Sequence, residues 1–230
     1  MSFATISSVD QPVLLMDGSK LVTSLANLAG TYNLLRFQKE LPKNGGTTAT
    51  RSSYATMVID NSGNWYFCKN VNACSSGTAT GSGTLNLQSG STDRFDLVAN
   101  SITRGTVFVS DNAGSKVLVV GENDAGDPNS TVRGLWIGAP RAAWVANDGS
   151  YMLNTTDFGR NAFSMSSNVI TASSTITATV DTPLQGFLTA QTSGNDNYII
   201  QTAVGLIVTA NNTANNFGAG PGYFSFGVKP

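Results

Sequence analysis

The chain has 230 residues, enough for one large β domain or two small ones whose hydrophobic core needs no metal or disulfide framework. Its hydrophobic fraction of 40% is ordinary, but its charged fraction of 12% is low for a soluble domain. A formal net charge of −1 with scattered Lys and Arg argues against nucleic acid as a partner, and the lack of any histidine argues against Ser-His-Asp, Cys-His and histidine-metal chemistry.

With so few charged residues, solubility depends on small and uncharged polar residues: Ser, Thr, Asn and 24 Gly. This composition is typical of extracellular β proteins, surface adhesins and viral structural proteins. No apolar run approaches the roughly 20 residues of a membrane helix, and the first residues lack the basic start and apolar stretch of a secretory signal. We therefore expect no membrane insertion and an extracellular or periplasmic location reached by processed export, with a virion surface as the alternative.

The N-terminal segment, residues 1–29, contains the single stretch that predicts a helix, "DGSKLVTSLANLAG". Asp17 or Ser19 can cap its start and Gly30 can end it. Four apolar residues share one face of it: Leu21, Val22, Leu25 and Leu28. We expect a short helix packed against a barrel end or a sheet edge.

The residues that follow this helix, "AGTYNLLRF", resemble the start of lipocalins and related calycins, in which a Gly-x-aromatic motif opens the first barrel strand. Tyr32 stands where those proteins usually have tryptophan, and the motif covers only a few residues. The resemblance implies a barrel shape, and no functional residue is carried over from it.

From residue 30 onward, apolar and polar residues alternate with period two, and turn residues interrupt the alternation every few positions. Turns such as "NSG", "DNAG" and "DG" suit hairpins because their central residues tolerate positive φ. The sequence therefore predicts an all-β fold, an antiparallel meander. The strands expected in the first half are YNLLRF, YATMVID, NWYFC, TLNLQ, RFDLV, TVFVS, KVLVVG and LWIGAP; those in the second are SYMLN, NAFSMS, NVITAS, TITATV, GFLTA, NYIIQ, GLIVTA and YFSFGV.

The two cysteines, Cys68 and Cys74, lie six positions apart. A hairpin connection there can bring them within bonding range, which predicts a small disulfide loop and an oxidising compartment. The alternative is two unrelated thiols. No second cysteine pair and no histidine exist to complete a zinc site, so we expect no metal and no cofactor.

Several short phrases occur twice in the chain. "GTLNLQSGSTD" matches "GFLTAQTSGND", "GTYNL" matches "GSYML", "GTVFVSDN" matches "GLIVTANN", and "LWIGAP" matches the terminal "SFGVKP". Because the matches occur in the same order, they predict two diverged copies of one β unit.

The first copy would span 30–140 and the second 149–230, joined by a connector at 141–148. Each copy holds about eight strands, which is enough to close a small barrel; a sandwich that shares sheets between the copies is the rival architecture. Since the connector "RAAWVAND" is too apolar for a loose tether, we expect the copies to pack together.

Acidic residues offer one weak metal site and no convincing catalytic pair. Asp93 and Asp96 point to opposite faces of a regular strand, so they are poor partners for glycosidase chemistry, which is nevertheless not fully excluded. Glu122, Asp124 and Asp127 lie in "GENDAGD", which we expect to be an exposed loop. This trio is a candidate calcium site although it lacks the ordered spacing of a calcium loop, and a solvated turn is the alternative.

Aromatic residues are the candidate ligand-binding residues. Trp65 and Tyr66 are neighbours on one strand, so one faces the core and the other can form a platform. Trp136, Trp144 and Tyr151 are expected to cluster at the junction between the copies, where a binding cleft or a packed seam can form. Sugar-binding proteins often stack sugar rings on such aromatics. The alternative is that these rings fill the core and the seam.

These observations favour a non-enzymatic binding protein that recognises a surface glycan or protein, of adhesin or receptor-binding type. A calycin-like carrier of a small apolar ligand is one alternative, and it predicts an internal cavity lined by Leu34, Val58, Val107 and Val119. A structural subunit of a surface or virion assembly is another, and in either case the chain can form a homo-oligomer.

Overall fold

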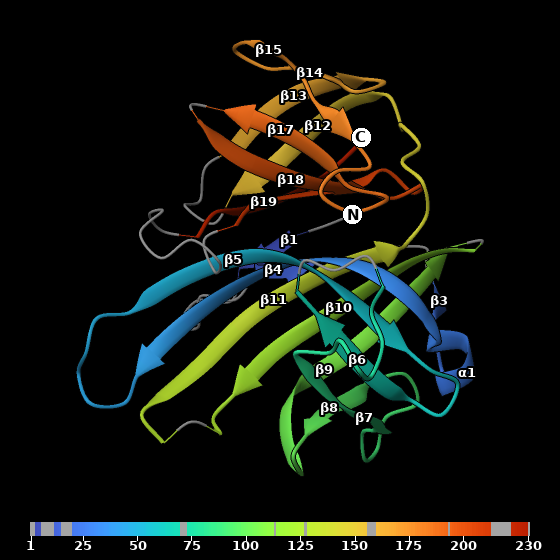
Figure 1. The fold of residues 1–230 in the computed structure, drawn as a ribbon, viewed down its shortest axis with the longest axis vertical. Helices are drawn as coiled ribbons and strands as arrows, with labels where there is room; N and C mark the ends of the chain where they lie inside the picture. The colour runs from blue at the N-terminus through green and yellow to red at the C-terminus, as the bar shows by residue number, and fades with distance from the viewer. Residues whose placement is uncertain are drawn as a thin grey trace.

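The computed structural model describes residues 3–5, 12–14, 20–69, 73–112, 114–126, 128–155, 160–192, 194–212 and 222–229. It confirms the predicted all-β class. Two nine-stranded antiparallel sheets and a small hairpin of β1 (Phe3–Thr5) and β2 (Pro12–Leu14) carry nearly all of the regular structure. Figure 1 shows the two sheets as two curved bodies, one above the other.

The first sheet closes into a barrel, called barrel 1 below. Each of its eight main strands pairs with the next in the chain, and the last pairs with the first, so it is an up-and-down barrel. The strands are β4 (Gly30–Pro42), β5 (Ala49–Ile59), β6 (Asn64–Cys68), β7 (Gly81–Leu87), β8 (Phe95–Ala99), β9 (Ile102–Asn112), β10 (Ser115–Asp124) and β11 (Ser130–Pro140).

The predicted helix is present but shorter than its pattern suggested. Helix α1 covers only Leu25–Leu28, and the Ser24 side chain caps it by accepting a hydrogen bond from Asn27 N. The start expected at Asp17 or Ser19 lies outside the described residues. Leu21 belongs instead to strand β3 (Lys20–Leu21), which pairs with β9 and so removes this segment from the helix.

The second sheet forms barrel 2. Its strands also follow chain order, and its first strand pairs with its last. Two of them, β15 and β16, are separated by the single buried residue Ala178 and occupy one position in the ring. The strands are β12 (Gly149–Thr155), β13 (Arg160–Ser166), β14 (Val169–Thr171), β15 (Thr175–Thr177), β16 (Thr179–Val180), β17 (Leu188–Thr192), β18 (Asn195–Gln201), β19 (Leu206–Asn211) and β20 (Phe224–Val228).

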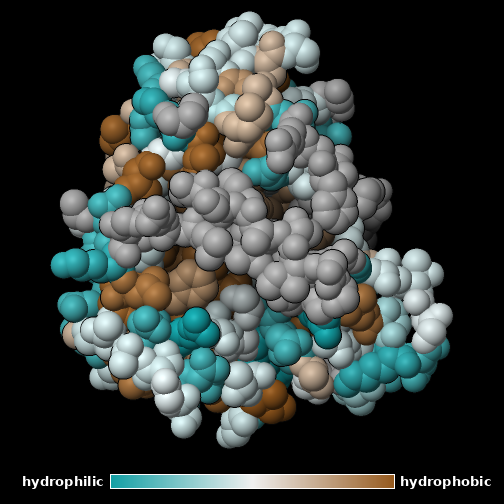
Figure 2. Space-filling model, turned by 180° about the vertical axis from the view of Figure 1, so that it is seen from behind, coloured by the Kyte–Doolittle hydropathy of each residue, from teal (hydrophilic) through white to brown (hydrophobic). Residues whose placement is uncertain are grey.

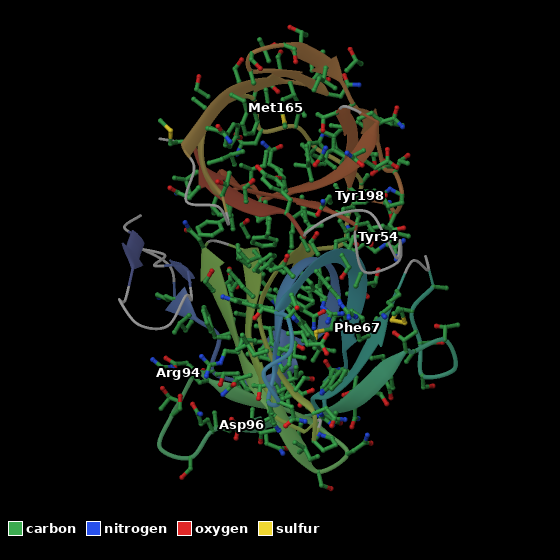
Figure 3. The ribbon with its side chains drawn as sticks, turned by 90° about the vertical axis from the view of Figure 1, so that its left-hand side faces the viewer. Tyr54, Phe67, Arg94, Asp96, Met165 and Tyr198 are labelled. Carbon is green, nitrogen blue, oxygen red and sulfur yellow. A yellow bond between two sulfur atoms is a disulfide. The ribbon has the colours of Figure 1, made fainter. Side chains whose placement is uncertain are left out.

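Alternation along the strands creates three separate apolar clusters. One fills the interior of barrel 1 with large side chains such as Trp65, Phe95 and Trp136. Another fills barrel 2 around Phe163 and Met165. The third, which we call the seam, lies between the barrels (Figure 3). Each strand at the seam therefore has two buried faces, one inside its barrel and one against the other barrel.

Among the described residues, fifteen buried apolar ones form the seam. At its centre, the Tyr54 ring of barrel 1 lies 5.8 Å from Phe187 and 4.5 Å from Tyr198 of barrel 2, measured between ring centroids. An apolar interface of this kind resembles a domain core. The seam residues are Leu35, Tyr54, Val117, Val119, Leu135, Ile137, Leu184, Phe187, Tyr198, Ile200, Leu206, Val208, Ala210, Phe224 and Phe226.

The matched phrases at the first strands of the two barrels have the same local structure. Gly30 and Gly149 have φ of 156° and 149°, and two residues later Tyr32 and Tyr151 each donate a hydroxyl hydrogen bond to the backbone carbonyl four residues upstream. The matched phrases in the last strands lie on equivalent strands, β11 and β20, but one residue out of register. Gly138 pairs with Leu34, whereas Leu153 pairs with Gly227 and not with Val228, the residue that the phrase aligns with Gly138.

The two middle matches lie on strands at different positions of the two barrels. "GTLNLQ" forms β7, the fourth strand of its barrel, whereas "FLTAQ" forms β17, the fifth position of the other barrel; the match between β9 and β19 is displaced in the same way. Neighbouring strands of a meander run in opposite directions, so these two similarities cannot reflect equivalent positions.

The predicted disulfide is confirmed. Cys68 at the end of β6 bonds to Cys74, with 5.6 Å between their Cα atoms. The bond closes a short loop ahead of β7.

Candidate functional site

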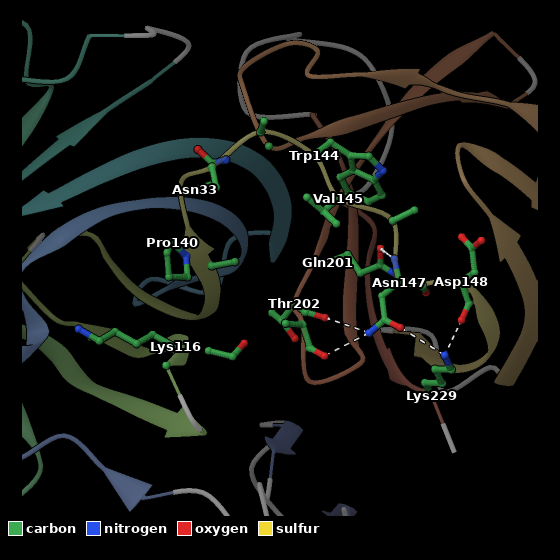
Figure 4. Close-up of a pocket in the computed structure, with 18 residues that line it drawn as sticks. Asn33, Lys116, Pro140, Trp144, Val145, Asn147, Asp148, Gln201, Thr202 and Lys229 are labelled. Atoms are coloured by element: carbon green, nitrogen blue, oxygen red, sulfur yellow. Dashed lines mark hydrogen bonds between the residues drawn. The ribbon is translucent and has the colours of Figure 1, made fainter.

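A cleft of about 770 Å³ lies where the connector between the barrels passes from one to the other (Figure 4). We call it the junction cleft. Barrel 1 contributes Asn33 and Lys116 to its wall, the connector contributes Trp144 and Val145, and barrel 2 contributes Gln201 among others. Figure 2 shows one face of the molecule, on which teal and white residues cover much of the upper and lower parts and brown residues gather nearer the middle.

Asp181 holds one end of the connector. Its Oδ1 accepts hydrogen bonds from the backbone N–H of Trp144 at 2.8 Å and of Gly186 at 2.7 Å. Asp181 has a φ of 52°, a conformation that aspartate tolerates better than most residues. This contact fixes the backbone that carries the Trp144 ring.

Asn147 holds the other end. Its backbone N–H donates to Gln201 Oε1 and its carbonyl accepts from Gln201 Nε2, both at 2.8 Å. Its side-chain oxygen accepts from Lys229 Nζ at 3.3 Å, and its amide nitrogen donates to the carbonyls of Thr202 and Ala203 (Figure 4). With both ends anchored, the wall of the cleft is preformed.

Two polar atoms of the cleft lining are buried without a hydrogen-bond partner in the described part of the chain. One is Oδ1 of Asn33, whose Nδ2 donates to the Gln185 carbonyl at 2.7 Å and so fixes the amide. The other is the indole Nε1 of Trp144. An unmet buried donor or acceptor costs about 1–3 kcal/mol.

The charged groups around the cleft already have partners. Lys116 Nζ donates to the Asn27 carbonyl, Lys229 Nζ donates to the Asp148 carbonyl, and Asp148 Oδ1 accepts from Ser167 N at 2.6 Å. Val145 beside them is 79% exposed, which is unusual for a large apolar side chain. The lining therefore offers one apolar surface and several uncharged polar groups.

Of the five aromatic residues expected to bind a ligand, the structure places only Trp144 in the cleft. Trp65 and Trp136 lie buried inside barrel 1, where Trp65 Nε1 donates to the Val98 carbonyl at 3.2 Å. Tyr151 lies inside barrel 2, and Tyr66 is half-buried. The expected cluster of Trp136, Trp144 and Tyr151 at the junction does not form, because alternation directs two of them into separate barrel interiors.

The expected calcium trio is also arranged differently. Strand β10 continues to Asp124, so Glu122 is buried and not in an exposed loop. Asp124 forms an ion pair with Arg104 at 2.5 Å, and Asp127 lies outside the described residues. Within the described residues, no group of three or more His, Cys, Asp or Glu side chains is placed to hold a metal ion.

The four residues expected to line the cavity of a carrier lie in different compartments of the molecule. Leu34 and Val107 pack in the barrel 1 core, Val119 faces the seam, and Val58 is half-buried on the opposite face of β5 from that core. These four side chains therefore do not line one cavity.

None of the family models, curated proteins or solved structures compared with this chain matches it. Among the described residues, no helix is long and apolar enough to cross a membrane. The residues that build the junction cleft besides Trp144, such as Asn33, Asp181 and Gln201, had no signal in the sequence, because Asn, Asp and Gln are frequent throughout the chain.

Proposed function

We propose that this chain is a non-enzymatic binding protein, of adhesin or receptor-binding type, that recognises a surface glycan in the junction cleft. The observation that carries the proposal is the lining of the cleft, which combines the Trp144 ring and the exposed Val145 with uncharged polar residues such as Asn147, Gln201 and Thr202. A sugar hydroxyl can both donate and accept a hydrogen bond, so it suits uncharged polar groups of this kind.

The rest of the lining supports the same class of ligand. Trp144 and the exposed Val145 supply apolar surface for the C–H faces of a sugar ring, while the surrounding amides supply uncharged polar contacts. Since the lysines are bound to backbone carbonyls, the lining has no unpartnered cluster of like charge that would favour an ionic ligand.

An extracellular or periplasmic location belongs to this proposal. The Cys68–Cys74 disulfide is compatible with an oxidising compartment, and the low charged fraction of 12% is compatible with an exported surface protein.

The test is a glycan array probed with the wild-type protein and three variants. We expect Trp144→Ala and Val145→Asp to lose about tenfold or more in affinity for the glycans that the wild type binds, because each removes apolar contact or a hydrogen-bond donor. Leu87→Asp is the matched control for Val145→Asp, since Leu87 is also a large exposed apolar residue, at 53%, and does not line the cleft.

A blank array for the wild type, or equal glycan binding by Trp144→Ala and wild type, would show that the glycan proposal is wrong. If the array is blank but binding to whole cells is present and is lost in Val145→Asp, the cleft recognises a protein.

A further inference from the structure

The interior of barrel 1 changes from apolar to polar halfway along its length. On β4, Tyr32 and Leu34 point into the apolar core, and Arg36, Gln38 and Glu40 follow at two-residue intervals on the same face. At the apolar end, Leu28 of α1 packs in the same core, and its carbonyl accepts a hydrogen bond from the Tyr32 hydroxyl at 2.7 Å. Arg36 therefore lies at the boundary between a filled half and a polar half.

The Arg36 guanidinium is held between two aromatic rings. Its Cζ lies 4.6 Å from the centroid of Phe67 and 4.5 Å from that of Trp136, and Figure 3 shows Phe67 within the lower barrel. Such cation–π contacts cover the faces of the guanidinium and leave its edge for hydrogen bonding. The position and plane of the group are thus fixed before any ligand arrives.

The edge of this guanidinium is not satisfied by the protein. Arg36 is only 8% exposed, yet its Nε is buried and has no hydrogen-bond partner in the described part of the chain. The nearby carboxylate of Glu122 instead accepts from Gln38 Nε2 at 3.0 and 2.9 Å and from Trp136 Nε1 at 2.9 Å. A buried charge without hydrogen bonds is costly, so the site favours an acceptor that the chain does not supply.

Exposure increases along the same interior from Arg36 to the rim. The side chains of Arg104 and Asp124, paired at 2.5 Å, are 23% exposed, and those of Glu40 and Arg51, paired at 3.0 Å, are 35% and 48% exposed. Arg51 shares the inner face because it lies opposite Gln38 in the β4–β5 register. The charged side chains towards this rim are therefore more accessible to solvent than Arg36 is.

We infer that Arg36 anchors a second binding site, inside barrel 1 and separate from the junction cleft, for a small molecule that carries a single carboxylate group. A carboxylate matches the planar fork of a guanidinium edge and accepts two hydrogen bonds from it. The negative charge of Glu122 beside the site selects a singly charged group over a dianion such as phosphate. Glu122 does not occupy the position itself, because Gln38 and Trp136 bind its oxygens.

The test is isothermal titration of the full chain with sodium acetate, butyrate and octanoate, followed in parallel by tryptophan fluorescence, with inorganic phosphate and sodium chloride at matched ionic strength as comparisons. We expect binding of at least one carboxylate and a change in fluorescence, since Trp136 contacts Arg36. Arg36→Lys keeps the charge but loses the fork, and we expect it to weaken binding by about tenfold or more.

Arg51→Lys is the matched control, because it makes the same change at the rim and should alter the affinity by less than about threefold. Glu122→Gln provides a second test if Arg36→Lys does not fold. It removes the neighbouring negative charge, and we expect it to tighten carboxylate binding. Val145→Asp, in the junction cleft, should leave carboxylate binding unchanged, which separates this site from the proposed glycan site.

The inference is overturned if no carboxylate binds at tens of millimolar, if phosphate or chloride produces the same heat and fluorescence change, or if Arg36→Lys and Arg51→Lys weaken binding equally. Loss of carboxylate binding in Val145→Asp would likewise place the ligand in the junction cleft.

Discussion

Gly186 lies close to both the connector and barrel 1. Its φ is 86°, and a Cβ added there would lie 2.5 Å from the Ala142 carbonyl oxygen and 2.7 Å from Asn33 Nδ2. We expect Gly186→Ala to destabilise the protein by about 2–4 kcal/mol, because it adds this clash to the strain of a positive φ. Urea denaturation followed by tryptophan fluorescence measures the change.

Gly194→Ala is the control for this prediction. Gly194 has a similar φ of 81°, but nothing lies within 4 Å of its added Cβ. The control should therefore show only the conformational cost, about 1 kcal/mol. Equal losses of stability in the two variants would mean that the contact with Ala142 and Asn33 is unimportant.

The residue scale is also where prediction from sequence was weakest. Period-two alternation places Trp65 and Tyr66 on opposite faces of one strand, but it says neither which of the two is buried nor which compartment a buried ring enters. Trp136 lies in barrel 1 and Tyr151 in barrel 2 although both are close to the junction in sequence. The long-range partners that decide this, such as Gln201 for Tyr151, are set by strand pairing and not by local pattern.

At the scale of elements, the hairpin that carries the disulfide allows a direct test. The Cys68–Cys74 bond closes a loop with a sequence separation of six residues. In the chain-entropy description, a loop of that size stabilises the folded state by about 2 kcal/mol. We expect the double variant Cys68→Ala/Cys74→Ala to lose about that amount in urea denaturation while keeping the far-ultraviolet circular dichroism of the native barrel.

Reduction of the wild-type protein with dithiothreitol should reproduce the loss. A double variant as stable as the oxidised wild type would contradict the prediction and would make the loop structurally dispensable.

Most of the strands themselves were predictable, because alternation and turn residues are local signals. Strand β6 coincides with the segment from which it was expected, whereas β5 begins earlier and β10 ends later than their expected segments. The helix was less predictable. Leu25 and Leu28 of its expected apolar face are helical, but Leu21 and Val22 form backbone hydrogen bonds with β9. Pairing with this distant strand competes with the local preference for a helical turn.

At the scale of the whole molecule, composition and strand number predicted two barrel or sandwich units but did not distinguish between them. That choice depends on whether β11 closes on β4 and β20 on β12. The seam was not predictable in detail either. Its residues, such as Leu35, Val117 and Ile137, alternate with the residues of the barrel core and produce nearly continuous apolar runs, which read as strands buried on both faces.

Two tyrosines of the seam lead us to expect that the stability of the folded protein falls at alkaline pH. Burial, together with Asp196 and Tyr54, raises the pKa of Tyr198 to about 12, and burial also raises the pKa of Tyr54. Below the unfolded pKa of about 10 both states keep the phenol protonated, so the stability is fully present. As the pH rises from 10 towards 12, the unfolded state ionises first, and the stability falls progressively.

Because Tyr198 and Tyr54 lie between the barrels, ionisation of their phenols should destabilise both barrels at once. We expect calorimetry to show a single transition whose midpoint falls steeply above pH 10, with equal calorimetric and van't Hoff enthalpies at lower pH. Tyr198→Phe should flatten this alkaline decline while leaving the single transition in place, since phenylalanine keeps the ring in the seam but does not ionise. Two separate transitions for the wild type would show that the seam does not couple the barrels, and an unchanged alkaline slope in Tyr198→Phe would show that the buried phenol is not the group that titrates.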